Sequence, residues 1–180
     1  MQLTKEYIKT LSKEDLQIYT DGSYNKDTHS AGAGVTFLIK DKILLQAYQP
    51  LGHNTNNFAE IYAVGMALTL IKQLQIPYTR THIFSDSIYT INTLTLKHST
   101  KVHINLKLIH IVRNMLKILN RNTPIIFHWT PSHKGIQGNT LADKLANQAT
   151  QIPDQQNIYT HHSHSKQYTP LTTTTYNNSW

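Results

Sequence analysis

Four of the ten acidic residues in this chain stand in short sequence contexts that could hold a metal ion. Each falls at the end of an apolar segment, where ordinary solvated acids would not gather; the four are Asp21, Glu60, Asp86 and Asp143. Carboxylate oxygens select hard cations, so the set favours Mg²⁺, and Mn²⁺ should substitute for it. With a phosphate group supplying further oxygens, such a cluster can hold two ions about 4 Å apart that clamp the attacking and leaving oxygens.

A structural explanation exists for each acid taken singly. An Asp after a strand is commonly a turn or cap residue, and an acid in a first helical turn, as expected for Glu60, is stabilised by the helix dipole. Four carboxylates brought together would repel and would raise one another's pKa unless cations neutralised them. The order and contexts of all four therefore favour a metal site over four unrelated caps.

The composition indicates one basic globular domain. The chain has 180 residues, enough for a single buried core, and 17 Lys plus Arg outnumber 10 Asp plus Glu, a formal net charge of +7. This charge favours a polyanionic partner such as nucleic acid, but it could equally serve solubility, and charge alone leaves both open. The absence of cysteine excludes disulfides and thiolate metal sites.

The first sixteen residues alternate charged and apolar side chains and contain no long hydrophobic run. We therefore expect neither a secretory signal nor a membrane span. The prediction is a soluble, intracellular protein without a membrane partner. Nucleus, cytoplasm and virus-like particle are not distinguished.

Hydrophobic periodicity predicts an α/β domain. We expect strands at 16–20 (half-buried, from its alternation), 35–39, 43–48, 82–85 and 125–129, and helices at 59–74, 87–96, 105–119 and through Leu141 and Ala149. Asp21, in a predicted Asp21-Gly22 turn, and Asp86 then follow strands, whereas Glu60 and Asp143 lie in the first turns of helices. All four can approach the carboxyl edge of the sheet, where open α/β sheets place their sites.

Three further expectations concern the rest of the chain. Asn56 or Asn57 should be the N-cap of the helix at 59–74, and Trp129 should lie in the core. The organisation predicted is an N-terminal extension at 1–14, the domain at 15–150, and a polar, disordered tail at 151–180. The tail sequence His161-His162-Ser163-His164 could bind a transition metal or be incidental.

Several short motifs occur together between residues 15 and 150. They are Thr20-Asp21-Gly22-Ser23, Asn56-Asn57 with Glu60, Ser85-Asp86-Ser87, and Trp129-Thr130-Pro131-Ser132-His133-Lys134-Gly135-Ile136 with Gly138-Asn139 and Asp143. In this combination the chain resembles the type 1 ribonuclease H family. The last motif is most similar to the reverse-transcriptase-associated domains of retrotransposons and retroviruses.

The resemblance implies a fold and a reaction. The fold would be the ribonuclease H-like α/β fold, a five-stranded mixed sheet, its first three strands antiparallel, flanked by helices. The reaction would be endonucleolytic hydrolysis of the RNA strand of RNA/DNA hybrids, leaving 5′-phosphate and 3′-hydroxyl ends. Partners would be the hybrid and a reverse-transcriptase or other polymerase domain, with the oligomeric state open.

The resemblance also assigns catalytic roles. Asp21, Glu60, Asp86 and Asp143 would be the ligands of two Mg²⁺ ions, one activating water and the other stabilising the departing 3′ oxygen. His133 would be the mobile histidine that assists proton movement or product release.

Substrate contacts follow from the same resemblance. Asn56 and Asn57 would read the RNA minor groove and its 2′-hydroxyls. Thr55 and Asn25 are candidates for holding a phosphate of the DNA strand. Gly22, Ser23 and Ser87, which flank two of the acids in the motifs, complete the predicted substrate-binding set.

The chain departs from the family pattern at several positions. Ile88 stands where Gln is frequent, and Thr140 where an acid is frequent. The 46 residues from Ser87 to Ser132 leave little room for an extra basic helix; Lys97, His98, Lys101 and His103 could replace it in part.

Two alternative functions predict different sequence features. A hybrid-binding scaffold domain without turnover would typically lose acids, and this chain has all four. A transposase or exonuclease of the wider superfold would have a different acid spacing and no loop like that at 132–135.

Overall fold

The computed structural model describes residues 2–74, 76–95, 105–132, 134–152 and 158–160. In chain order the elements are α1 (Gln2–Thr10), β1 (Leu16–Asn25), β2 (Ser30–Ile39), β3 (Lys42–Gly52), α2 (Asn56–Ile71), β4 (Thr81–Ser85), α3 (Ile88–Leu94), α4 (Leu106–Leu119), β5 (Ile125–Trp129), α5 (Gln137–Ala149) and β6 (Ile158–Thr160). No helix within these described ranges combines the length and apolarity that crossing a bilayer requires.

The expected five-stranded mixed sheet is confirmed. The strand order is β5-β4-β1-β2-β3, with β6 added at the β3 edge. β1, β2 and β3 are antiparallel, whereas β1 pairs with β4, and β4 with β5, in parallel. Parallel pairing requires crossover connections, and α2 supplies the one between β3 and β4 while α3 and α4 supply the one between β4 and β5.

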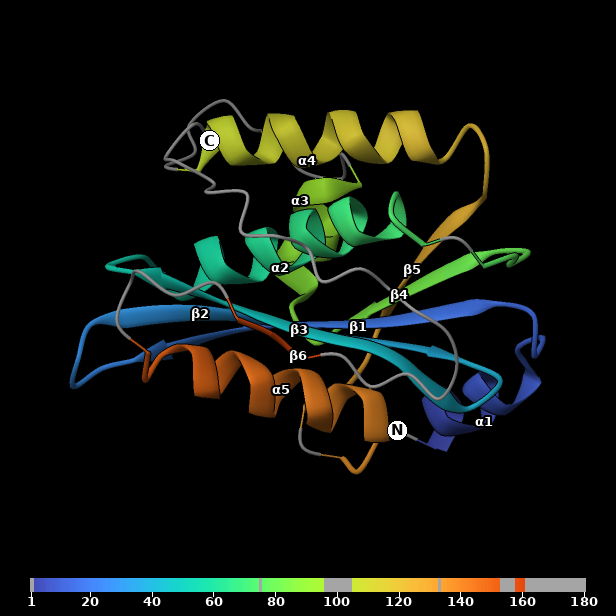
Figure 1. Ribbon diagram of the computed structural model, residues 1–180, viewed down its shortest axis with the longest axis horizontal. Coiled ribbons are helices and arrows are strands. Elements are labelled where there is room, and N and C mark those ends of the chain that lie inside the picture. The colour runs from blue at the N-terminus through green and yellow to red at the C-terminus, as the bar shows by residue number, and fades with distance from the viewer. Residues whose placement is uncertain (1, 75, 96–104, 133, 153–157, 161–180) are drawn as a thin grey trace.

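Helices cover both faces of this sheet (Figure 1). α2, α3 and α4 lie on one face, and α5 lies on the other together with α1. The larger core forms between α2, α4 and the sheet, with Leu16, Ile18 and Ile83 fully buried in it. We predicted a half-buried strand at 16–20, and this was wrong: β1 is buried on both faces because it is central and has a helical layer on each side.

Glycines on β2 let α5 rest directly on the strand backbone. A Cβ built at Gly34 would lie 2.3 Å from the Ala142 carbonyl oxygen, and one at Gly32 would lie 2.5 Å from that of Ala146. Neither contact could be relieved by a side-chain rotation, because the atoms approached belong to backbone. The depth at which α5 carries Asp143 past the sheet is therefore set by backbone packing.

The N-terminal extension contains a helix that the sequence pattern did not predict. Residues Ile8 and Leu11, on and just after α1, pack against the cluster that contains Tyr19 and Phe84. The Tyr7 ring lies 4.9 Å from the ring of His128, between centroids. α1 and the residue after it thus pack against side chains of β1, β4 and β5.

A buried polar chain ties β1, β4 and β5 together beneath α1. His82 Nδ1 lies 2.8 Å from His128 Nε2, and His82 Nε2 lies 3.3 Å from Asp15 Oδ2. Burial lowers the pKa of His82, and burial together with His82 lowers the pKa of His128 to about 4. Both imidazoles are accordingly neutral near pH 7, and their contacts are hydrogen bonds rather than ion pairs.

The polar tail is described only in part. Residues Ile158–Thr160 pair antiparallel with β3 as β6. The other residues after 152, including the histidines at 161, 162 and 164, lie outside the described residues. The disorder predicted for 151–180 and the metal hypothesis for its histidines stay predictions.

Candidate active site

The parallel pairing of β1 with β4 brings two of the four acids to one edge of the sheet. That ladder ends at the pair Thr20 and Ser85, and the next residues on the two strands are Asp21 and Asp86. We predicted that the strand would end in a turn at Asp21-Gly22, which was wrong: β1 continues to Asn25 through its pairing with β2. Asp21 therefore sits inside a long strand, at the point where its parallel neighbour stops.

Gly22 brings helix α2 against β1. A Cβ on this residue would lie 2.3 Å from the Glu60 backbone nitrogen and 2.7 Å from the Ala59 carbonyl carbon. The absence of a side chain thus allows Glu60, the fifth residue of α2, to reach Asp21. The Gly22 backbone also hydrogen-bonds the carboxylates of Asp21 and Glu60.

Three of the acids form one compact group. Oxygen atoms of Asp21, Glu60 and Asp86 all lie within 4.8 Å of one another. Asp21 and Glu60 are each only 5% exposed, whereas Asp86 and Asp143 are partly exposed. Asp143, from the second turn of α5, is close enough for its charge to act on Asp21.

The electrostatics of the group fit a cation. Burial, and then the charges of Asp86 and Asp143, raise the pKa of Asp21 to about 8. Burial and the charge of Asp21 raise the pKa of Glu60 well above its usual value. Glu60 Oε2 is moreover buried without a hydrogen-bond partner among the described residues. A buried acceptor without a donor, among like charges and with an all-oxygen donor set, is the environment that a hard divalent cation stabilises.

Asp86 is held by two donors, one from the last residue of β5 and one from the segment after it. Ser132 Oγ donates to Asp86 Oδ2 at 2.7 Å, and the Trp129 indole N–H donates to the Asp86 carbonyl at 3.0 Å. The prediction that Trp129 lies in the core was wrong, since its side chain is 48% exposed. β5 is an edge strand, and its last residue uses the indole to fix Asp86 instead of filling the core.

Comparison with known proteins places this chain in a family. The RNase H family model matches residues 13–151. A ribonuclease H from Ruthia magnifica subsp. Calyptogena magnifica is 32% identical over 140 residues, which cover 73% of this chain and 92% of that relative. The chain belongs to the RNase H family. The family predicted from the motifs is confirmed, and the chain is an enzyme of the ribonuclease H class.

Solved structures agree with this assignment. The N-terminal RNase H domain of a Mycobacterium tuberculosis protein, solved as a fusion with maltose-binding protein, superposes with a TM-score of 0.63 at 25% identity, covering 76% of this chain and 98% of that one. The foamy viral protease-reverse transcriptase, solved in complex with an RNA/DNA hybrid, has a TM-score of 0.64 at 26% identity. That match covers 78% of this chain and 21% of the viral one.

The RNase H residues predicted to contact substrate lie in several environments. Asn56 and Asn57 are exposed in the first turn of α2, close in sequence to Glu60. The N-cap of α2 is Thr55, whose hydroxyl accepts from Phe58 N at 3.1 Å, so the prediction of Asn56 or Asn57 as the cap was wrong. All three residues could cap a helix, and Thr55 is the one whose backbone is extended.

Other predicted contacts are engaged within the protein. Ser87 caps α3: its hydroxyl accepts from Thr90 N at 3.2 Å and donates to Thr90 Oγ1 at 3.0 Å. Asn25 Oδ1 holds a turn by accepting from the backbone N–H groups of residues 27 and 28. Ser23 donates to Asn147, on α5. His133, Lys97, His98, Lys101 and His103 lie outside the described residues.

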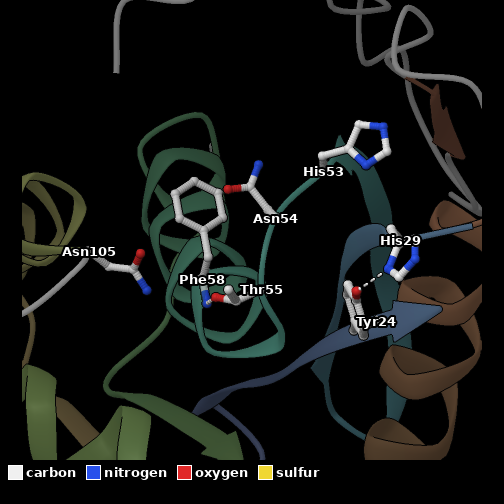
Figure 2. Close-up of a pocket in the computed structure, with 7 residues that line it drawn as sticks. All are labelled: Tyr24, His29, His53, Asn54, Thr55, Phe58 and Asn105. Carbon is white, nitrogen blue, oxygen red and sulfur yellow. Dashed lines mark hydrogen bonds between the residues drawn. The ribbon is translucent and has the colours of Figure 1, made fainter. Parts of the chain in front are cut away.

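An open pocket of about 510 Å³ lies at the start of α2. Its lining comprises Tyr24, His29, His53, Asn54, Thr55, Phe58 and Asn105. Figure 2 shows Thr55 and Phe58 at the beginning of α2, with Asn105 on one side and His53, His29 and Tyr24 on the other. The Tyr24 hydroxyl is hydrogen-bonded to His29 Nδ1 at 2.8 Å.

Two residues of this pocket were missed by sequence reasoning. His53 precedes Thr55 by two positions, and Asn105 is the residue before α4. Asn105 looks like an ordinary N-cap in sequence, but its side chain makes no capping hydrogen bond and Nδ2 is buried without a partner among the described residues. Only the fold brings this donor, 50 positions away in sequence, to Thr55.

Proposed function

We propose that this RNase H chain is an endoribonuclease that hydrolyses the RNA strand of RNA/DNA hybrids and leaves 5′-phosphate and 3′-hydroxyl ends. The supporting observation is the compact group of Asp21, Glu60 and Asp86, with the charge of Asp143 acting on Asp21 and a buried Glu60 oxygen that has no donor among the described residues. Asp21, Glu60, Asp86 and Asp143 would hold two Mg²⁺ ions, with Mn²⁺ as a substitute. When bound, the ions would supply an activated water and charge stabilisation of the departing 3′ oxygen.

The protein groups divide into two pairs by exposure. Asp21 and Glu60 are buried, and with cations bound they would provide negative charge on the protein side of the site. Asp86 and Asp143 are partly exposed and complete the site on the side that the scissile phosphate can reach. His133, four positions before the first residue of α5 in sequence, is proposed to assist proton movement or product release, as the motif implies.

Strand discrimination is proposed to lie at the start of α2. The exposed Asn56 and Asn57 carry amide groups that can both donate to and accept from a 2′-hydroxyl, the group that distinguishes RNA from DNA. Both stand within one helical turn of Glu60, so RNA read there would pass beside the carboxylates. The foamy viral protein, solved with an RNA/DNA hybrid, supports this substrate, and its reverse transcriptase supports a polymerase domain as a partner.

The pocket of Figure 2 is proposed to hold a phosphate of the DNA strand. Among the residues that the structure describes, Asn105 Nδ2 is a buried donor without an acceptor, and the Thr55 hydroxyl, which already accepts from Phe58, has its own proton to donate. His53 lines the same pocket. The amide donor of Asn105 and the hydroxyl donor of Thr55, both lining one open pocket, suit a single phosphate group.

We expect Asn105→Leu to raise KM for hybrid by roughly 5–20-fold, the loss of about one hydrogen bond to a charged group. The value of kcat should change little, because the pocket is separate from the carboxylates. Steady-state cleavage of a labelled hybrid measures both constants, with Asn122→Leu as an exposed control. A lower kcat at unchanged KM would contradict the assignment of this pocket to phosphate binding.

The function itself is tested by cleavage of a hybrid with labelled RNA in Mg²⁺, alongside RNA/RNA and DNA/DNA duplexes and an Asp86→Asn control. We expect only the RNA of the hybrid to be cut, the product ends to be 5′-phosphate and 3′-hydroxyl, and the control to be inactive. A hybrid that is bound but left intact in both Mg²⁺ and Mn²⁺ would instead support the scaffold alternative.

A further inference from the structure

One hydrogen-bonded chain links strand β1 to Asp143 on α5 and has no part in the proposed function as stated so far. The Ser23 hydroxyl donates to Asn147 Oδ1, and Asn147 Nδ2 donates to Asp143 Oδ1 at 3.0 Å. Ser23 and Asn147 are 124 positions apart in sequence, so the chain bridges two elements rather than one helix turn. It ends on one of the four carboxylates of the acid group.

The spacing of the four residues explains why the bridge fits. Asp21 and Ser23 are two positions apart on a strand, which places them on one face about 7 Å apart. Asp143 and Asn147 are four positions apart on a helix, which places their Cβ atoms about 6 Å apart on one side. The spacing of about 7 Å on the strand nearly equals the spacing of about 6 Å on the helix where α5 crosses β1. The Ser23–Asn147 contact therefore lies beside the Asp21–Asp143 pair, as a second rung between the same two elements.

We propose that Asn147, oriented by Ser23, is a positioning residue for Asp143 in the metal site. The inference rests on the proposed function, because it assigns Asp143 to a cation. The Ser23 hydroxyl determines which side of the Asn147 amide faces β1, and that leaves Nδ2 facing Asp143. The donated proton occupies Oδ1 and fixes the carboxylate plane, so Oδ2 is the oxygen free of this donor.

The neutrality of the donor matters as much as its position. A Lys or Arg at this place would form an ion pair with Asp143 and compete with a bound cation. An amide orients the carboxylate and leaves its full negative charge available. Ser132 likewise donates a hydrogen bond to the Asp86 carboxylate from a neutral group, its hydroxyl. In the part of the chain that the structure describes, no Lys or Arg forms an ion pair with either carboxylate.

An Asn four residues after an Asp on an exposed helix face can be an ordinary surface pair. Such a pair would stabilise the helix slightly and would not depend on Ser23. A positioning role for the bridge to β1 predicts something different. Loss of Ser23 and loss of Asn147 should both lower the affinity for the cation, and neither should chiefly affect folding.

Mn²⁺ binding measured by calorimetry without nucleic acid, together with the Mg²⁺ concentration for half-maximal cleavage, tests the proposal. Asn147→Leu keeps the size and is favourable in a helix but removes both hydrogen bonds. We expect roughly 10-fold weaker Mn²⁺ binding and a similar rise in the Mg²⁺ requirement. Ser23→Ala should give a smaller change in the same direction, roughly 3-fold. Ser23→Thr, which restores the hydroxyl, should bind Mn²⁺ as wild type does. Gln148→Ala, on the exposed side of α5, should match wild type in both measurements.

The outcomes separate the inference from the proposed function. Mn²⁺ binding by Asn147→Leu within twofold of wild type would overturn the inference, and so would a Ser23→Ala variant indistinguishable from wild type. If Asn147→Leu fails to fold, as judged by circular dichroism, the Ser23 variants decide. Should wild type bind Mn²⁺ but leave hybrid uncut, the proposed function fails, and the calorimetric comparison still tests the bridge.

Discussion

A Gly22→Ala variant is expected to lose roughly 100-fold or more of its hybrid cleavage, because a displacement of about 1 Å at a catalytic group has this effect. The added methyl would lie 2.3 Å from the Glu60 nitrogen and 2.7 Å from the Ala59 carbonyl carbon. Both are backbone atoms, so no rotamer change makes room, and α2 must move away from β1. We also expect a loss of about 1–3 kcal/mol in the free energy of unfolding, typical of overpacking.

Cleavage kinetics in Mg²⁺ and urea unfolding measure the two effects. Gly65→Ala is the matched control. It also adds one methyl group, here on α2, but that methyl group would approach only a side-chain methyl of Val112, at 3.0 Å. This control should keep its activity and nearly all of its stability. Wild-type cleavage by Gly22→Ala would show that the close approach of α2 to β1 does not set the geometry of the acids.

Asp21→Asn should abolish cleavage and yet stabilise the protein when no metal is present. Burial and the neighbouring Asp86 and Asp143 raise the pKa of Asp21 from 3.8 to about 8. The folded state therefore binds this proton more tightly than the unfolded chain does. The metal-free wild type is most stable, as far as this group is concerned, below about pH 4, and loses that stability as the pH rises through about 8. Asn does not titrate, and its amide can donate to Asp86, so the variant escapes the loss.

Urea unfolding in EDTA at several pH values checks this prediction. The advantage of the variant should be small near pH 4 and reach roughly 2–5 kcal/mol above pH 8, within the range that linkage allows for this pKa shift. Mg²⁺ should raise the stability of wild type and have much less effect on the variant. Asp27→Asn, at an exposed turn after β1, is the control and should leave the pH profile unchanged. Equal midpoints for Asp21→Asn and wild type at pH 8 would contradict the prediction.

The sequence was sufficient for the order of the main elements and for the grouping of the acids. Periodicity distinguishes strands from helices, and the acids follow or begin the predicted elements, so their convergence at one sheet edge could be inferred from topology. Local signals failed where a distant element decided the outcome. Asp21-Gly22 has the composition of a turn, but this glycine is required by α2, which approaches it from 38 positions further along the chain.

Other errors have the same origin. Trp129 follows apolar residues and seemed to belong to the core, but whether its strand is central or at an edge depends on pairing that no local pattern encodes. Thr55, Asn56 and Asn57 are equivalent as caps until the backbone at Thr55 is known. Asn105 has an unusual role only because its side chain makes no capping bond. These are long-range or conformational facts, and a single sequence reports them weakly.

The bare glycine strip across β1 and β2 has a consequence for protein design. Gly22 lets α2 touch the backbone of β1, and Gly32 and Gly34 let α5 touch the backbone of β2, so the depths of Glu60 and Asp143 relative to the sheet depend on these close contacts. A designer who transplanted the four acids alone onto another three-layer scaffold would obtain the right ligands at the wrong depth. The glycines must be transplanted with the acids, because they set how closely the helices that carry the acids approach the sheet.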